Sequence, residues 1–185
     1  MGSGPAENDD DNRRQHVPDG IAADHLTSGL LGRYRGLLPL AVLGVMVLVA
    51  LTGALGGAPN PTVRAEGAAG ALELKAPQIL RNGTFFEMDI AVVAERPIAE
   101  PVIAISRSYL KDMTVNTHLP EPADMGFEGD AFTMTYPAMD AGDRLLVKLD
   151  GQINPPLIGR SVGTITLRDD KTAIAEIPVA LRVLP

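Results

Sequence analysis

Two patterns of apolar residues divide this chain. From Leu37 to Leu55, nineteen consecutive residues carry no charge. A helix of that length is about 28 Å long, close to the thickness of the hydrocarbon core of a bilayer. From residue 71 onward, apolar residues instead alternate with polar ones, which is typical of half-buried strands. The pattern therefore predicts one transmembrane helix followed by a domain built from β-strands.

The residues on either side of the apolar run predict the orientation of this helix. Arg33 and Arg35 flank Tyr34 just before the run, and the first charge beyond it is Arg64. Basic residues gather on the cytoplasmic side of a membrane span, and tyrosine favours the interface. We therefore predict an anchor in the cytoplasmic (inner) membrane, with the N-terminus in the cytoplasm and the C-terminal domain periplasmic or extracellular. Its anchor residues are Arg33, Tyr34, Arg35, Leu37 and Leu55.

A cleaved signal peptide is the alternative interpretation of the same run. The apolar region of a signal peptide usually has about 7 to 15 residues, and this one is longer. Val63-Arg64-Ala65 resembles a small-residue cleavage site only weakly. A retained anchor is therefore the preferred interpretation, and whether the span is cleaved stays open.

Composition divides the rest of the chain. Residues 1–28 hold three consecutive aspartates, glycine and proline with few apolar residues, which predicts a disordered acidic cytoplasmic tail. Residues 29–56 form the juxtamembrane segment and helix. Residues 57–70, rich in Gly, Ala and Pro, are predicted to be a linker. Residues 71–185 form the extracytoplasmic domain.

The domain is predicted to be an all-β sandwich. Its clearest strand runs through Phe86, Met88, Ile90, Val92 and Ala94, which place an apolar residue at every second position. Turns such as Asn82-Gly83 and Asp169-Asp170-Lys171 recur at roughly ten-residue spacing. Seven to eight short strands spaced in this way favour an antiparallel, immunoglobulin-like β-sandwich.

Three irregular segments receive their own predictions. Residues 108–113 are expected to make one helical turn. Residues 119–128 contain two prolines and a glycine and are predicted to form a loop. Pro178 lies inside the last predicted strand, which indicates an edge position or a bulge because proline has no N–H to donate.

A series of turn-like motifs runs through the domain. They are Phe86-Glu87-Met88, Met113-Thr114-Val115-Asn116-Thr117, Pro120-Glu121-Pro122, Ala141-Gly142-Asp143, Gln152-Ile153-Asn154-Pro155 and Ile158-Gly159-Arg160. With these motifs, the apolar run and the domain resemble an uncharacterised bacterial family of single-span membrane proteins with an exported immunoglobulin-like β-sandwich. The resemblance implies this architecture and no activity.

Charge and cysteine content exclude several classes of function. The formal net charge is −7, whereas binding to a phosphate backbone needs clustered Lys and Arg, so no nucleic-acid partner is expected. The chain has no cysteine. Disulfide frameworks, thiolate zinc sites and thiol nucleophiles are therefore excluded.

No catalytic set is recognisable in the sequence. The predicted domain has one histidine, His118, which we expect in a loop near Asp112 and Asp124. Nucleophilic catalysis needs a hydroxyl beside a base that a third group orients. A hydrolase therefore requires a cleft that gathers His118 with a hydroxyl and a carboxylate. We predict instead a protein without catalytic residues, cofactor or metal.

Exposed aromatic and loop residues are the best candidates for contact with a partner. Phe85 must point away from the core if Phe86 points into it, and burial against a neighbouring strand or loop is the alternative. The predicted loop 119–128 carries two more apolar side chains, and function concentrates on the loops of rigid scaffolds. The candidate interaction surface consists of Phe85, Tyr109, His118, Met125 and Phe127.

These predictions favour a non-enzymatic, membrane-anchored accessory or assembly protein. Its partners are membrane lipid and an integral membrane protein or complex. The alternative is a module that binds an envelope ligand or polymer. A linker of this length reaches only tens of ångströms, which suits a partner in the same membrane better than a distant polymer.

Overall fold

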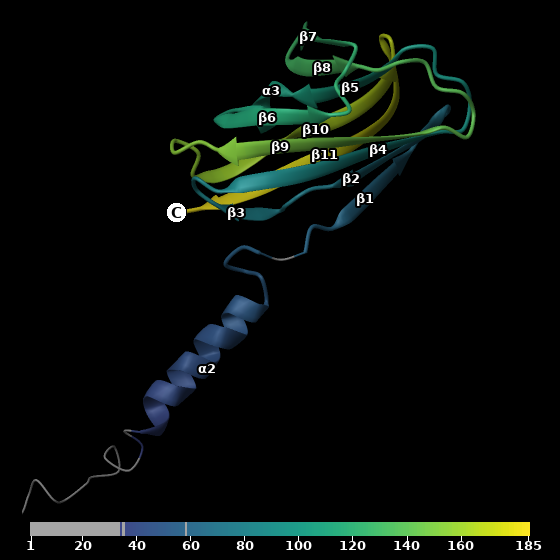
Figure 1. The fold of residues 1–185 in the computed structure, drawn as a ribbon. Helices are drawn as coiled ribbons and strands as arrows, with labels where there is room; N and C mark the ends of the chain where they lie inside the picture. The colour runs from purple at the N-terminus through teal and green to yellow at the C-terminus, as the bar shows by residue number, and fades with distance from the viewer. Residues whose placement is uncertain (1–33, 35, 58) are drawn as a thin grey trace, which may run out of the picture. The chain divides into compact units, whose positions relative to one another are not determined.

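The computed structural model describes residues 34, 36–57 and 59–185 of the chain (Figure 1). The first element among the described residues is helix α2 (Leu37–Leu51). The β-domain contains eleven strands and one short helix. They are β1 (Thr62–Glu66), β2 (Gly70–Lys75), β3 (Ile79–Arg81), β4 (Phe85–Ala94), β5 (Pro101–Ser106), α3 (Arg107–Leu110), β6 (Met113–Leu119), β7 (Asp124–Glu128), β8 (Ala131–Thr135), β9 (Arg144–Ile153), β10 (Gly159–Asp169) and β11 (Thr172–Leu184).

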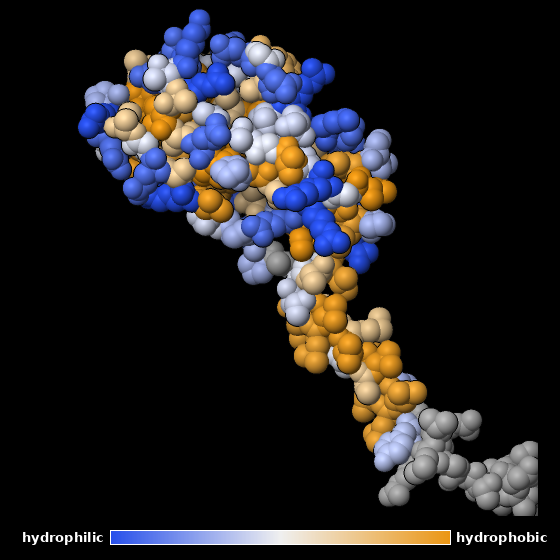
Figure 2. Space-filling view, turned by 180° about the vertical axis from the view of Figure 1, so that it is seen from behind, coloured by the Kyte–Doolittle hydropathy of each residue, from blue (hydrophilic) through white to orange (hydrophobic). Residues whose placement is uncertain are grey.

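Helix α2 presents apolar side chains on all sides, and none of its residues is buried. Figure 2 shows this helix as a largely hydrophobic surface. The helix ends at Leu51 rather than at the predicted Leu55, because Gly53 has a φ of 71°. A left-handed glycine of this kind commonly terminates a helix.

The described residues test the predicted membrane anchor only in part. Tyr34, Leu37 and Leu55 are exposed. Within residues 34, 36–57 and 59–185, no helix has both the length and the apolar character needed to cross a bilayer. Arg33, Arg35 and the predicted tail of residues 1–28 lie outside the described residues.

The domain is an all-β sandwich of two sheets. One sheet has five strands in the order β1-β2-β4-β9-β6, and the other has six in the order β3-β11-β10-β5-β8-β7. Neighbouring strands are antiparallel except β3 and β11, which are parallel. The two-sheet sandwich is confirmed, but the prediction of seven to eight strands was too low.

Short strands at the edges account for the difference in strand number. β1 lies inside the predicted linker and pairs with β2 along its whole length. Its Arg64 is 2.7 Å from Glu73 on β2, so a cross-strand ion pair accompanies the backbone pairing. β7 lies inside the predicted loop and pairs with β8. Each of these strands has only five residues, too few for a clear alternation in the sequence.

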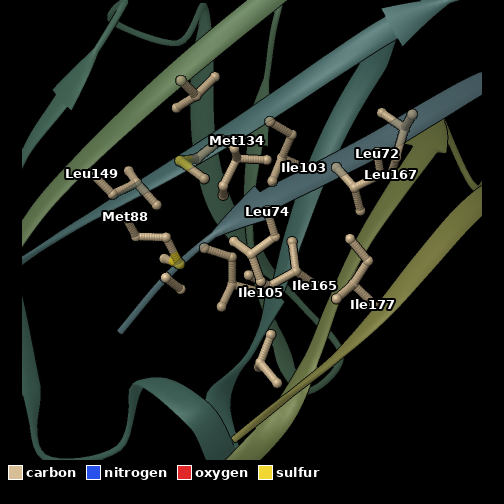
Figure 3. Close-up of a cluster of buried hydrophobic side chains, with 14 of the residues drawn as sticks. Leu72, Leu74, Met88, Ile103, Ile105, Met134, Leu149, Ile165, Leu167 and Ile177 are labelled. Carbon is tan, nitrogen blue, oxygen red and sulfur yellow. The ribbon is translucent and has the colours of Figure 1, made fainter. Parts of the chain in front are cut away.

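The core lies between the two sheets (Figure 3). Leu72, Leu74, Met88 and Leu149 reach into it from the five-stranded sheet. Ile103, Ile105, Met134, Ile165, Leu167 and Ile177 meet them from the six-stranded sheet. The predicted inward residues of β4, from Phe86 to Ala94, are buried. Alternation of side chains along each strand therefore builds the core as expected.

The predicted turns are present, with one change of role. Asp169-Asp170-Lys171 joins β10 to β11, and Asp170 has a φ of 51°. Gly83, with a φ of 74°, makes a turn, but this turn joins β3 to β4 in different sheets and is not a hairpin. Pro178 pairs with Thr164 on one side only, because β3 reaches just the last residues of β11. β11 is an interior strand of its sheet, but this stretch of it has no neighbour on one side, so the position predicted for Pro178 is edge-like only locally.

Candidate functional site

One strand of the six-stranded sheet has no strand opposite it. The ring of His118 on β6 lies 6.0 Å from that of Phe132 on β8, so β6, the last strand of its sheet, lies over β8. β7 is the next strand outward, at one extreme of the sandwich (Figure 1). The five-stranded sheet has no further strand to cover it.

The side chains of β7 that face inward are exposed as a result. Met125 and Phe127 stand opposite Met134 and Phe132 of β8, on the face where Met134 is completely buried. Nevertheless, 74% of Phe127 and 48% of Met125 are exposed. These two side chains point inward as core residues do, but no strand of the opposite sheet covers them.

The uncovered face forms a hollow of about 790 Å³. Its apolar lining comes from three strands and α3. It consists of Leu110, Met113, Val115, Met125, Phe127 and Phe132, with His118 beside them. We call this surface the edge hollow. Charged residues of α3 and the segments around it, Arg107, Lys111, Asp112 and Asp130, complete its rim. A volume of this size is typical of ligand-binding clefts.

A β-bulge turns His118 into the edge hollow. Met113 and Val115 stand opposite Ile153 and Gly151 of β9, both buried. The register then shifts at Asn116, so that His118 faces the buried Leu149. The expectation that His118 lies in a loop was therefore wrong, because β6 extends to Leu119 through this bulge.

His118 brings one unsatisfied polar atom to the edge hollow. Its Nε2 is buried and has no hydrogen-bond partner in the described part of the chain. Its ring also contacts that of Phe132, which in turn lies 5.4 Å from that of Phe127. A buried polar atom without a partner costs about 1–3 kcal/mol.

Tyr109 does not belong to the candidate surface. Only 2% of it is exposed, because α3 packs its ring into the core. Burial raises the pKa of the Tyr109 hydroxyl to about 12. Its carbonyl accepts a 2.8 Å hydrogen bond from the Ser161 hydroxyl on β10, which holds α3 in place. The prediction that Tyr109 contacts a partner at the surface was wrong.

Phe85 is exposed but lies elsewhere. It precedes the buried Phe86 on β4, so it points to the outer face of the five-stranded sheet, and 71% of it is exposed. The alternative of burial against a neighbouring strand is therefore wrong. The structure thus brings His118, Met125 and Phe127 together and separates Phe85 from them.

Sequence reasoning missed Leu110 of α3 and three strand residues of the apolar lining. Met113 and Val115 of β6 and Phe132 of β8 line the hollow, and each follows the alternation that indicates core residues. No local signal distinguishes an inward residue that is covered from one that is not. Only the strand order identifies these three.

The arrangement offers an apolar surface with one polar atom. His118 Nε2 forms no hydrogen bond to a hydroxyl or carboxylate of the described residues. Among the same residues, no group of three potential ligands is placed to hold a metal ion. The hollow is suited chemically to burial of apolar groups.

Two solved structures are similar to part of this chain. A non-cellulosomal cohesin from the hyperthermophilic archaeon Archaeoglobus fulgidus matches 60% of this chain and 88% of its own, with 16% identity and a TM-score of 0.40. CaCohA2 from Clostridium acetobutylicum, known from a solution structure, matches 57% of this chain and 90% of its own, with 16% identity and a TM-score of 0.37. Similarity at this level assigns no function.

No protein-family model and no curated protein sequence matches the chain. The resemblance to a bacterial family of single-span proteins therefore stays a prediction for the membrane span and the family. Its β-sandwich agrees with the fold described above. The class that the fold and the site define is a two-sheet β-sandwich with an uncovered apolar edge.

Proposed function

We propose that this protein is a membrane-anchored, non-enzymatic binding protein whose β-sandwich contacts a partner protein through the edge hollow. One observation carries the proposal: Phe127 and Met125 face inward yet are 74% and 48% exposed. Apolar side chains gathered in this way mark interaction surfaces more often than scattered ones do. Aromatic residues and methionine are also enriched where proteins bind each other.

Helix α2 supports the anchoring part of the proposal. Fifteen residues without a charge expose their side chains on every side, which is unfavourable in water and favourable in lipid. The helix alone is about 22 Å long, so uncharged residues beyond its end, up to Leu55, would have to contribute to a span. A short span is accommodated when the bilayer thins locally.

The proposed orientation has the N-terminus in the cytoplasm and the β-domain outside it. A C-terminal tag and protease added to intact spheroplasts test this orientation. We expect the tag to be removed, and the same protein to resist extraction from membranes by alkaline carbonate. Full protection of the tag, or release of the protein by carbonate, would contradict the proposed topology.

The binding role is tested on the full chain purified from membranes in mild detergent. We expect an integral membrane protein to co-purify, to be lost from the Phe127→Ser variant and to be retained by Phe85→Ser. The second variant is a matched control because both phenylalanines are about equally exposed, on different sheets. Recovery of the wild-type protein alone would count against the proposal.

A module that binds an envelope polymer is the second candidate function. The uncovered Phe127 also suits stacking against a sugar ring. This alternative predicts that purified envelope polymer binds the full chain in detergent and that Phe127→Ser abolishes binding. Equal binding of the polymer by the Phe127→Ser and Phe85→Ser variants would rule out this alternative.

A further inference from the structure

The edge hollow borders the one edge strand that carries no charge. The four edge strands of the sandwich are β1, β6, β3 and β7. β1 contains Arg64 and Glu66, β3 contains Arg81, and β7 contains two acidic residues. β6, with the sequence MTVNTHL, has neither a charged residue nor a proline. Charges and prolines are the usual means by which edge strands avoid pairing with other chains.

The free edge of β6 and the uncovered face of β7 adjoin each other. A strand that paired with the outer edge of β6 would become the sixth strand of its sheet. It would lie over β7 in the same way as β6 lies over β8. Its inward side chains would then cover Met125 and Phe127. One extended segment therefore satisfies both the free backbone groups of β6 and the exposed apolar face.

From this, and on the basis of the proposed binding role, we infer that the partner inserts an extended polypeptide segment that pairs with β6 and fills the edge hollow with alternate apolar side chains. Added strands of this kind obtain affinity from backbone hydrogen bonds and specificity from side-chain pockets.

The charges at the rim define the segment further. Arg107 and Lys111 are balanced by Asp112 and Asp130. None of these four residues forms an ion pair with another described residue. A rim with equal numbers of positive and negative groups matches an electrically neutral segment. A strongly acidic or basic peptide would meet like charges at this rim.

A second copy of this chain does not fit the same place. If two β6 strands paired antiparallel, the twofold axis would leave both six-stranded sheets on the same side. β8 of the second copy would then enter the space that β7 of the first copy occupies, because in each copy the six-stranded sheet extends one strand beyond β6. The segment must therefore come from a chain that brings no second sheet with it.

The absence of cysteine allows a direct test. In the full-length Lys111→Cys variant in detergent, the new thiol next to β6 is joined by a disulfide to the peptide Val-Thr-Val-Thr-Val-Thr-Val. Two versions of this peptide are used, one with a cysteine added at its N-terminus and one with a cysteine added at its C-terminus. Tethering raises the effective concentration to about the millimolar range. Two other tethers serve as controls, a peptide of the same composition with the valines grouped together and a ten-carbon alkyl chain.

Hydrogen exchange of the amides is the readout. We expect the alternating peptide to slow exchange at β6 at least tenfold for the outward-facing amides, and both controls to leave β6 unchanged. The Phe127→Ser and Met125→Ser variants should lose this protection, whereas Phe85→Ser should keep it. Thermal unfolding of each variant establishes that it is folded.

Several results would overturn the inference. One is unchanged exchange at β6 whichever end of the alternating peptide is tethered. Another is protection at β7 instead of β6. A third is equal protection by the alkyl chain, which would indicate a lipid ligand. Protection of β6 in a dimer without peptide would indicate a second copy. The proposed binding role is tested separately from strand addition. If a partner co-purifies and is lost with Phe127→Ser while exchange at β6 stays unchanged, the binding role stands and strand addition is rejected.

Discussion

The interior of the sandwich is closed on one side and open on the other. On the closed side β2 packs against β11, and there Leu74 is 4% exposed and Ile177 is 1% exposed. On the open side β7 has no strand above it, and Phe127 is 74% exposed. All three side chains face inward by the same alternation. The comparison shows that alternation sets the direction of a side chain, whereas the opposite strand decides whether it is buried.

Two of the aromatic residues predicted to lie at the interaction surface fall on opposite sides of this comparison. Tyr109 belongs to the closed interior, and Phe127 belongs to the open one. Both lie in segments predicted to be irregular. Aromatic character and a neighbouring turn therefore do not identify an interaction surface. The number of strands in each sheet identifies the uncovered surface instead.

The largest expected effect comes from the closed side. Replacement of the fully buried Leu72 by Ala should lower the free energy of unfolding by about 2–5 kcal/mol, because it leaves a cavity between the sheets. The exposed Leu146→Ala on β9 is the control and should change it by about 0.5 kcal/mol or less. Denaturant unfolding measures both. Equal losses would mean that the closed side is less well covered than described.

Alkaline pH should also act through the closed side. Burial raises the pKa of Tyr109 to about 12, and that of Tyr136 to about 12, from the usual value of 10.0. The folded state thus keeps these protons more tightly than the unfolded state. Stability is complete below pH 10 and falls as the pH rises toward 12, by roughly 2–3 kcal/mol for Tyr109.

Ultraviolet absorbance of ionised tyrosine follows this titration. In the folded protein the absorbance step of Tyr109 and Tyr136 should appear near pH 12 or together with unfolding, and Tyr109→Phe should remove part of it. A step near pH 10 for both residues while the protein stays folded would contradict their burial.

A third comparison sets two glycines against each other. A Cβ at Gly163 of β10 would collide with the Ser106 hydroxyl and come within 2.8 Å of Tyr109 Cβ, where α3 packs closely. A Cβ at Gly126 of β7 would make only an ordinary 3.7 Å contact with Thr133. Gly163→Ala should therefore destabilise the domain by about 1–3 kcal/mol, and Gly126→Ala should be tolerated. Thermal unfolding of both variants measures the difference, and equal tolerance would disprove the close packing of α3.

The smallest expected effect on stability comes from the open side. Phe127→Ala should cost about 1 kcal/mol or less, since its ring contacts Phe132 but remains mostly exposed. Denaturant unfolding alongside Leu72→Ala provides the direct comparison. A loss as large as that of Leu72→Ala would show that β7 is covered in solution.

Local patterns in the sequence were sufficient for much of the fold. The alternation through β4, the turn at Asp170 and the locally edge-like position of Pro178 followed from side-chain direction and turn chemistry. β7 did not, because Gly126 and the nearby Pro120 and Pro122 suggest a loop. Its pairing with β8 depends on a neighbouring strand that no local pattern encodes.

The candidate site depended still more on tertiary structure. Met125 and Phe127 were recognisable as apolar residues among prolines and glycines, but their inward direction comes from pairing with β8. The bulge at Asn116 sends His118 inward and leaves Leu119 on the outer side, 56% exposed, where simple alternation from Met113 would place it inside. A bulge depends on how two strands pair, so the sequence of one strand does not reveal it.

The sequence by itself determined which residues prefer to leave water: the uncharged run that contains α2 and the alternating apolar residues of the strands. These preferences are properties of single side chains and of their spacing. Only the tertiary structure decided that five strands lie over six and that β6 keeps a free edge beside an uncovered β7. Strand order depends on the pairing of distant segments, and burial depends on what lies opposite.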